Sequence, residues 1–308
     1  GSANKWYGGP VFRLSPLERL RRSGVAPDRG LGQNFLTDPN ILDVIERMAS
    51  LGPDDIALEV GPGLGVLTER LLDRCGFVHS VEMDQRLAAG LEAEFGGRAD
   101  FQLHMGDAVR FDFASLAPPP TKFVANLPYN VAAPLVMKSL AELPSLGLWC
   151  LMLQKEIADR FFAMPGSSNY GGISVMTQLA TEKVSSRPVA PTVFFPRPRV
   201  QSNLLVFRRR PATEFPIAGF ARIREIVYAA FSHRAKKLVN SLAEAGPELL
   251  PSGRGCGGST QSAATTLAAG KRRLEELLSR LGFAGEVRPQ ELTPGQFARL
   301  VELMDETK

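Results

Sequence analysis

Cysteine is scarce in this sequence, with three residues among 308. Cys75, Cys150 and Cys256 lie far apart and form no Cys-x-x-Cys pair. This spacing argues against a disulfide framework and against a structural zinc site. We therefore expect a protein of the reducing cytoplasm that carries no metal.

Long apolar runs are also missing. No run approaches the roughly 18–20 residues that a membrane helix needs, so no membrane association is expected. The first ten residues, GSANKWYGGP, lack a basic segment followed by an apolar one, and we expect no secretory signal. Gly1-Ser2 has the form of a cloning remnant. The hydrophobic share of 44 % is ordinary for a soluble globular protein.

The positive charge is concentrated in one part of the chain. Residues 187–237 hold eleven Lys or Arg and two Glu, a net charge of +9. The remaining residues hold 25 basic and 30 acidic side chains, a net charge of −5. Clustered basic side chains gain affinity for polyanions by releasing counterions from phosphates. A solvated basic face would explain the same pattern, but a polyanionic partner is the more specific hypothesis.

Strands and helices alternate through the first two thirds of the chain. Apolar runs that end at glycine or polar residues predict strands near 56–61, 77–84, 101–108 and 122–129, and the segment 148–161 is predicted to run from a strand into a helix. Helical periods at 66–75 and 85–95 lie between them. This alternation indicates an α/β fold with a doubly wound sheet.

The same patterns divide the chain into three parts. Residues 1–28 combine the cloning remnant with a basic arm, and residues 29–210 hold the α/β pattern. Residues 211–308 show helical periods and predict a small all-helical domain. Within it, residues 251–270 are rich in Gly, Ser, Thr and Ala and predict a flexible loop. No heptad pattern is present, so we expect a monomer.

A glycine-rich turn follows the first strand of the alternating pattern. The segment EVGPGLG at 59–65 places Gly61 and Gly63 where a backbone must turn tightly and approach a ligand. The spacing differs from the G-x-G-x-x-G of dinucleotide sites. Turn chemistry alone would also explain the glycines.

Acidic residues end the next two strands. Glu82 lies 21 residues after Gly61, where a carboxylate takes two ribose hydroxyls. Asp107, followed by Ala108 in the segment GDA, can accept a hydrogen bond from an adenine amine, although a helix N-cap is the simpler alternative. Together these strand ends predict a pocket for an adenosine ligand, either NAD or S-adenosylmethionine.

The fourth strand ends in Asn126-Leu127-Pro128-Tyr129. If the Asn126 side-chain oxygen and the Leu127 carbonyl accept the N–H bonds of adenine N6, the nitrogen lone pair is aimed at an electrophile. Both acceptors bind the nitrogen better as it gains positive charge, which is differential binding of the transition state. The Tyr129 ring offers a face on which the base can stack. A proline turn whose Asn only caps is the alternative.

The ordered set of motifs resembles a known family. GQNFL at 32–36, EVGPGLGVLT, VEMD, GDA, NLPYN, LMLQKEIADRF, YGGISV, FFPRPRV and FSHRAKKLVNSL occur in this order. The chain is similar to the ribosomal RNA adenine dimethyltransferases, and most to their bacterial small-subunit branch. The resemblance covers about residues 29–245 and, weakly, the final ELTPGQFARLVELM.

This resemblance implies a Rossmann-like methyltransferase domain at 29–210 that binds S-adenosylmethionine and releases S-adenosylhomocysteine. It implies these cofactor-binding residues: Gln33, Asn34, Leu36, Gly61, Gly63, Glu82, Asp107, Ala108 and Asn126. It implies these catalytic residues: Asn126, Leu127, Tyr129 and Phe194. Tyr129 and Phe194 would hold the target adenine between them, and Phe194 is preferred to Phe195 because of the F-x-P-x-P-x-V spacing.

The basic segment supplies the expected RNA contacts. These are Arg208, Arg209 and Arg210 at the domain junction, and Arg234, Lys236 and Lys237 on one predicted helix. Tyr228 and Phe231 lie near them, with core packing as their expected role. The sequence departs from the family pattern at Leu31, where an aromatic residue is usual, and at Gly172, where a basic residue is common. The 251–270 insert is a third departure.

We therefore expect an enzyme that dimethylates N6 of two adjacent adenines in a loop of small-subunit ribosomal RNA during ribosome biogenesis. Its partner would be the immature small subunit. A large-subunit methyltransferase of the antibiotic-resistance type is one alternative, and it typically carries Ile where Leu127 stands. A non-catalytic RNA-binding or assembly factor is the alternative from another class. The glycine spacing and NLPY disfavour a nicotinamide dehydrogenase.

Overall fold

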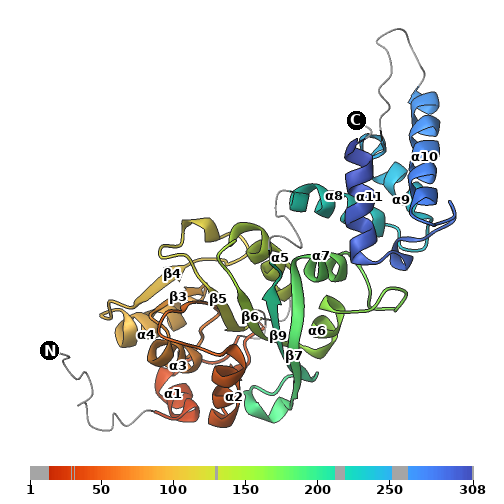
Figure 1. Cartoon of the computed structure of the whole chain (residues 1–308). Helices are drawn as coiled ribbons and strands as arrows, with labels where there is room; N and C mark the ends of the chain where they lie inside the picture. The colour runs from red at the N-terminus through yellow and green to blue at the C-terminus, as the bar shows by residue number, and fades with distance from the viewer. Residues whose placement is uncertain are drawn as a thin grey trace.

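The structure is a computed structural model, and it describes residues 14–28, 30, 32–128, 131–211, 219–251 and 263–306. In these residues, seven strands form one central sheet in the order β4-β3-β2-β5-β6-β9-β7 (Figure 1). The strands are β2 (Ile56–Val60), β3 (Phe77–Glu82), β4 (Phe101–Met105), β5 (Lys122–Asn126), β6 (Leu148–Gln154), β7 (Thr181–Val189) and β9 (Ser202–Arg209). The predicted α/β fold is confirmed.

The sheet is parallel except at one edge. Strands β2 to β6 pair in parallel, and β9 runs antiparallel to both β6 and β7. The strand order reverses between β2 and β5, so a crevice opens at their carboxyl ends. The glycine turn follows β2 and the NLPY segment follows β5. Both motifs therefore meet at this crevice.

Helices cover both faces of the sheet. On one face lie α2 (Pro39–Ala49), α3 (Val66–Arg74) and α4 (Gln85–Phe95), and on the other lie α5 (Ala132–Glu142), α6 (Lys155–Phe161) and α7 (Gly172–Ala180). Because side chains alternate along a strand, Ala57 packs against the helices of the first face and Leu58 against those of the second. Two-sided burial explains why these strands are continuous apolar runs.

The basic arm is partly a docked helix. Helix α1 (Pro16–Ser23) begins with a capping box in which Ser15 and Glu18 satisfy each other's backbone N–H groups. Arg19 is buried and binds Glu69 and Glu94 on α3 and α4. The arm is thereby attached to α3 and α4 through the buried guanidinium of Arg19, whose two carboxylate partners are partly exposed.

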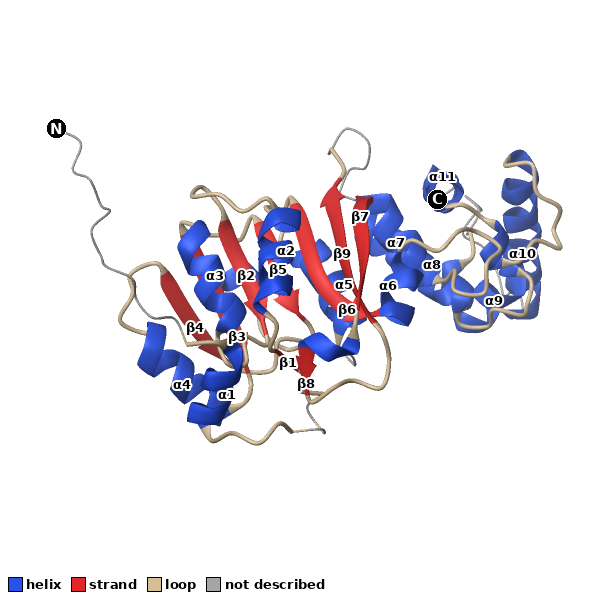
Figure 2. Cartoon of the chain, turned by 90° about the horizontal axis from the view of Figure 1, so that it is seen from below, coloured by secondary structure: helices blue, strands red, loops and turns tan. Residues whose placement is uncertain are grey.

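A short second sheet connects distant motifs. Strands β1 (Phe35–Leu36) and β8 (Phe194–Phe195) pair antiparallel, with Leu36 opposite Phe194. A 3-10 turn, η2 (Pro191–Val193), precedes β8, and Val193 accepts the backbone N–H of Thr37 at 2.8 Å. Figure 2 shows the pair at the carboxyl ends of the main parallel strands. GQNFL and FFPRP thus lie together at the crevice.

The C-terminal part is helical, as predicted. It consists of α8 (Phe220–Phe231), α9 (Leu238–Ala245), α10 (Ala263–Arg280) and α11 (Pro294–Glu306), with 3-10 turns at η4 (Pro247–Leu249) and η5 (Pro289–Glu291). Helices α8 and α11 pack against α7 of the catalytic domain, and Figure 1 shows the helical part beyond that end of the sheet. One continuous apolar core runs through the junction.

Two details of this part differ from expectation. Residues 263–270 belong to α10 rather than to the predicted 251–270 loop, because the alanines that make the segment appear simple are strong helix formers. The remainder of that insert, 252–262, lies outside the described residues, as does Cys256. Arg234, Lys236 and Lys237 lie in the turn between α8 and α9 rather than on one helix.

Arg209 proves to be a structural residue. Its Nε donates to the Leu146 carbonyl at 2.7 Å and its Nη2 to the Leu143 carbonyl at 2.9 Å. The guanidinium also lies 5.1 Å from the ring centre of Trp149. Burial lowers the pKa of Arg209. We therefore reassign Arg209 from RNA contact to support of the loop between α5 and β6.

We predict that Arg209→Ala lowers the free energy of unfolding by about 2–3 kcal/mol, because two carbonyl groups lose their donor. Thermal denaturation would show a midpoint lower by roughly 4–10 °C. Arg208→Ala is the matched control, since its exposed ion pair with Glu182 contributes at most about 1 kcal/mol. Equal stability of the two variants would contradict the reassignment.

Candidate active site

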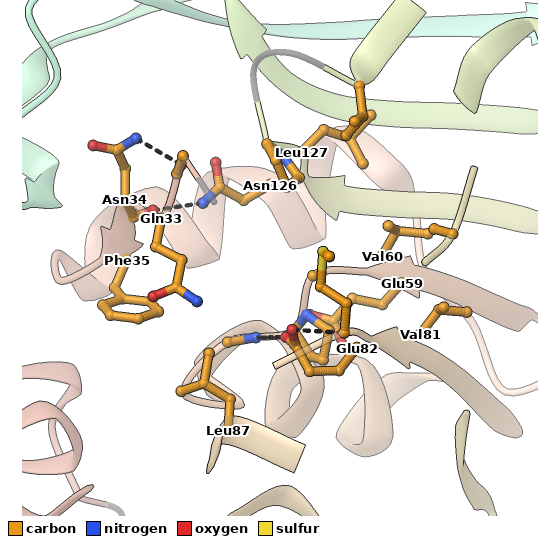
Figure 3. A pocket seen from close by; sticks show the side chains of 18 of the residues that line it. Gln33, Asn34, Phe35, Glu59, Val60, Val81, Glu82, Leu87, Asn126 and Leu127 are labelled. Atoms are coloured by element: carbon orange, nitrogen blue, oxygen red, sulfur yellow. Dashed lines mark hydrogen bonds between the residues drawn. The ribbon is translucent and has the colours of Figure 1, made fainter. Parts of the chain in front are cut away.

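A cavity of about 460 Å³ occupies the crevice at the carboxyl ends of β2, β3 and β5 (Figure 3). It brings together every predicted cofactor residue. The lining includes Gln33, Asn34, Leu36, Gly61, Gly63, Glu82, Asp107, Ala108, Asn126 and Leu127. Because these residues come from five separate segments, only the fold joins them. The role of each in binding stays a prediction.

The glycine turn is shaped for close approach. Gly61 and Gly63 have φ angles of +69° and +59°, which side-chain-bearing residues rarely adopt. A Cβ on Gly63 would meet the Phe35 ring at 3.1 Å, and one on Gly61 would lie 3.5 Å from Pro128. The turn after β2 is therefore packed against both the GQNFL loop and the NLPY turn.

Glu82 is held rigidly at the end of β3. Its side chain is 5 % exposed. Oε1 accepts the backbone N–H groups of Met83 and Asp84 at 2.9 Å, and Oε2 accepts that of Gly63 at 3.2 Å. Burial raises the pKa of Glu82 and these three hydrogen bonds oppose the rise. The carboxylate is thus fixed beside the glycine turn before any ligand arrives.

Gln33 fastens the loop that closes one side of the cavity. Its Nε2 donates to Asp84 Oδ2 at 3.0 Å, and its Oε1 accepts the backbone N–H of Asp28 at 2.8 Å. Asp84 is also bound by Arg86, whose guanidinium holds the pKa of that carboxyl well below its usual range. The amide of Gln33 therefore links the N-terminal loop to the end of β3.

The side-chain nitrogen of Asn126 is held by a hydrogen bond. Its Nδ2 donates to the Asn34 backbone carbonyl at 2.9 Å, as Figure 3 shows. Its Oδ1 accepts no hydrogen bond from any residue within the described ranges. This arrangement leaves an acceptor at the cavity. The next residue, Leu127, is fixed by its backbone N–H to the Met152 carbonyl at 3.2 Å.

Asp107, which follows β4, and the aromatic residues predicted to stack on the target base have different environments. Asp107 Oδ1 accepts the backbone N–H of Val109 at 2.9 Å, a turn-capping bond, and its side chain remains partly exposed. Phe194 is 2 % exposed and packs in the core, whereas Phe195 is 46 % exposed. The stacking role of Phe194 stays a prediction, and Tyr129 lies outside the described residues.

Glu59 is a site residue that the sequence interpretation missed. It is 1 % exposed, lines the cavity, and its Oε2 accepts hydrogen bonds from Thr68 and Ser80 at 2.7 and 2.9 Å. Burial raises its pKa to about 7. The signal was available, since a glutamate inside the apolar run IALEVG must be buried in a two-sided sheet.

The predicted RNA contacts lie away from this cavity. Each of the remaining ones has an intramolecular partner: Arg208 binds Glu182, Arg210 the Gln178 carbonyl, Arg234 the Ser167 and Ser168 carbonyls, Lys236 Glu244 and Lys237 Glu286. Exposed pairs of this kind exchange at little cost. Their binding to RNA stays a prediction.

Comparison with known proteins decides the family. The ribosomal RNA adenine dimethylase family matches residues 28–250. The chain belongs to this family. A relative from Rubrobacter xylanophilus, named ribosomal RNA small subunit methyltransferase A, is 39 % identical over 275 residues and covers 89 % of this chain and 94 % of its own. A relative of the same name from Kineococcus radiotolerans is 41 % identical and covers 91 % and 86 %.

Solved structures show the same dimethylase architecture. A dimethyladenosine transferase from Plasmodium falciparum is 25 % identical, has a TM-score of 0.72, and covers 88 % of this chain and 98 % of its own. The 23S rRNA methyltransferase ErmE is 28 % identical with a TM-score of 0.59, covering 88 % and 100 %. The Rossmann-like methyltransferase fold followed by a helical region is therefore confirmed.

Within the described residues, no helix is long and apolar enough to cross a membrane. Nor do those residues hold a group of three or more His, Cys, Asp or Glu side chains that could bind a metal ion.

We predict that Glu59→Gln changes how stability depends on pH. The folded protein keeps a proton on Glu59 up to about pH 7, whereas the unfolded chain releases it near pH 4.5. Wild-type stability from this group is therefore lost as pH rises through that window. Relative to wild type, the free energy of unfolding of the variant should rise by about 3 kcal/mol between pH 4.5 and 7.5. Urea denaturation across this range measures it, and a pH-independent difference would refute the buried-carboxyl interpretation.

Proposed function

We propose that this protein transfers methyl groups from S-adenosylmethionine to N6 of adenines in small-subunit ribosomal RNA. The immature small subunit is the proposed substrate, with two adjacent adenines converted to N6,N6-dimethyladenosine. The observation that carries the proposal concerns Asn126. Its side-chain nitrogen is bound to the Asn34 carbonyl, and its side-chain oxygen is left as an acceptor at the cavity. The protein is proposed to act as a monomer in the cytoplasm.

The residues of the cavity fit this cofactor. The Glu82 carboxylate is prepositioned to accept the two ribose hydroxyls, and the positive-φ turn at Gly61 and Gly63 leaves room for close backbone approach. Asp107 and Ala108 border the region where the adenine would lie. When bound, S-adenosylmethionine supplies an electrophilic methyl group on a positively charged sulfur. Glu59, buried on the cavity lining, adds a carboxyl group whose protonation alters the charge of the site.

Asn126 and Leu127 act on the target amine. The free Oδ1 of Asn126 and the carbonyl of Leu127 accept the two N6–H bonds and orient the nitrogen lone pair. Both acceptors strengthen as the nitrogen gains positive charge, so they stabilise the transition state more than the bound adenine. No ionisable base is required, because the N6 proton becomes acidic once the new N–C bond forms. The hydrogen bond to Asn34 keeps the amide from rotating.

The target base must leave its stack to reach this site. Adenines in RNA loops are unstacked at lower cost than those in duplexes. Tyr129 and Phe194 are proposed to hold the base between two rings, at about 1–3 kcal/mol for each stacking contact. The basic residues Arg208, Arg234 and Lys236 are proposed to bind the RNA backbone near the helical part.

Substitution of the ribose ligand should weaken cofactor binding. We predict that Glu82→Gln raises the dissociation constant for S-adenosylhomocysteine by about 10- to 100-fold, because hydrogen bonds to a charged acceptor become bonds to a neutral amide. Isothermal titration calorimetry measures this change. Glu92→Gln, on the exposed side of α4 and remote from the cavity, is the matched control. Unchanged affinity in Glu82→Gln would remove Glu82 from the cofactor site.

The decisive experiment identifies the methylated nucleoside. The protein is incubated with radiolabelled S-adenosylmethionine and immature small subunits, and the digested RNA is separated into nucleosides. Label is expected in N6,N6-dimethyladenosine, with at least a 100-fold lower rate for Asn126→Ala, which loses an acceptor made for the transition state. Calorimetry with S-adenosylhomocysteine checks that the variant still folds and binds.

Other outcomes of that experiment assign the alternatives. Label in large-subunit RNA alone would favour the antibiotic-resistance type. Cofactor binding without label in either subunit would favour a non-catalytic assembly factor. Full activity of Asn126→Ala would contradict the mechanism while leaving the reaction intact.

A further inference from the structure

A second cavity, of about 450 Å³, lies where the catalytic and helical parts join. Its lining comes from α5, α6, the start of α7 and the end of α8, helices that Figure 1 places at this junction. Ala133, in the first turn of α5, borders this groove, and Val131, two residues earlier, borders the cofactor cavity. The groove is therefore close to the NLPY turn, since residues two positions apart in the sequence line the two cavities.

Tyr228 forms an aromatic wall of the groove. Its side chain is 46 % exposed, so the expectation that it packs in the core is wrong. Phe231, one turn later on α8, does pack inward, with ring centres 6.0 Å from Tyr170 and 5.9 Å from Phe297. The two aromatic residues thus have different environments. Packing within the protein does not explain why a large aromatic ring is exposed beside a cavity, and exposed apolar surface of this kind often marks a binding site.

Gly172 keeps the space beside this ring open. A Cβ at this position would lie 3.5 Å from Val227 and 3.8 Å from Tyr228. A longer side chain would therefore extend into the groove along the Tyr228 ring. This is the position where the resemblance leads one to expect a basic residue. With glycine at this position, the positive charge is absent and the space beside the Tyr228 ring is open.

Arg160 and Arg234 line the groove, and Arg224 lies near it on α8. Arg160 on α6 and Arg224 on α8 make no ion pair or hydrogen bond through their side chains with residues in the described ranges. Arg224 lies one helical turn before Tyr228, on the same side of α8. Arg234 is oriented by the carbonyls of Ser167 and Ser168 at 2.7 and 2.6 Å, which leave its charge uncompensated. The rim is therefore positively charged.

We propose that this groove binds an unpaired nucleotide of the RNA substrate that flanks the methylated adenine. The base stacks on Tyr228 above the apolar floor formed by Ile157 and Ile173, and Arg160 and Arg234 bind its phosphates. An exposed aromatic ring beside uncompensated arginines is the usual chemistry of single-stranded nucleic-acid sites. Because the groove is close to the NLPY turn, the bound nucleotide would be a neighbour of the target adenine. The inference rests on the proposed function and adds a second base-binding site to it.

Cross-linking locates the nucleotide directly. The full chain is mixed with immature small subunits and S-adenosylhomocysteine, irradiated with ultraviolet light, and digested with trypsin and ribonuclease. Cleavage after Arg224 and Arg234 releases the peptide EIVYAAFSHR, which contains Tyr228. Mass spectrometry is expected to find a nucleotide adduct on Tyr228 in this peptide.

Kinetics tests whether the contact matters for the reaction. Tyr228→Ala is expected to lower kcat/KM on subunits by about 5- to 100-fold, the range for one stacking contact. Tyr228→Phe, which keeps the ring, recovers most of this loss, whereas Tyr228→Leu does not. The affinity of all three variants for S-adenosylhomocysteine matches that of wild type, which separates loss of the groove from loss of the fold.

Salt dependence tests the phosphate contact. Arg160→Gln is expected to reduce the slope of log affinity against log salt for the subunit by about 0.7, the loss of one phosphate contact to an unpaired strand. Arg47→Gln is the matched control, because this exposed arginine lies on α2 at the other face of the sheet. Its slope is expected to equal that of wild type.

The outcomes separate the two proposals. If wild type transfers no methyl group to small subunits, the proposed function fails, whatever Tyr228 does. If wild type methylates the subunit but Tyr228→Ala is equally efficient and the peptide carries no adduct, the groove proposal is overturned. An adduct together with a loss recovered by Tyr228→Phe supports it.

Discussion

The hydrogen bond from Asn126 Nδ2 to the Asn34 carbonyl connects the parts of the site that the chain keeps far apart. It joins the end of β5 to the loop before β1, across 92 residues of sequence. The same loop is paired through Leu36 with Phe194 and is fastened to β3 by Gln33. A single amide therefore receives its orientation from the N-terminal loop. Because the nitrogen is held by this hydrogen bond, the remaining oxygen keeps a fixed position at the cavity.

Buried carboxylates add a second constraint on this site. Glu59 and Glu82 stand near the carboxyl ends of adjacent parallel strands. Glu59 accepts hydrogen bonds from Thr68 and Ser80, and Glu82 accepts them from the backbone of Gly63, Met83 and Asp84. Burial raises the pKa of both carboxyl groups. Thr68 and Ser80 make the burial of Glu59 tolerable by donating to one oxygen. The polar groups at the carboxyl ends of the strands are thus satisfied within the fold and also line the cavity.

The parts of this structure that follow from local pattern were predictable from the sequence. Glu82 and Asn126 end apolar runs, and the carboxyl ends of parallel strands meet at one edge, so their proximity was expected. The function of Arg209 was not, because its partners Leu143 and Leu146 are more than 60 residues away and accept through backbone atoms. Residues 263–270 were misassigned because composition suggested a loop where alanine favours helix. Exposure of Tyr228 depends on how α7 and α8 pack, which no local pattern encodes.

The apolar core that passes from the sheet through α7 into α8 and α11 has a mechanical consequence. A junction made of packed side chains resists bending in a way that a polar linker does not. The helical part therefore behaves as a rigid extension of the catalytic domain, and its distance from the cofactor cavity is fixed. Under the proposed function, this fixed distance selects the substrate. An RNA whose contacts were spaced differently would bind the helical part and leave its adenine outside the cavity.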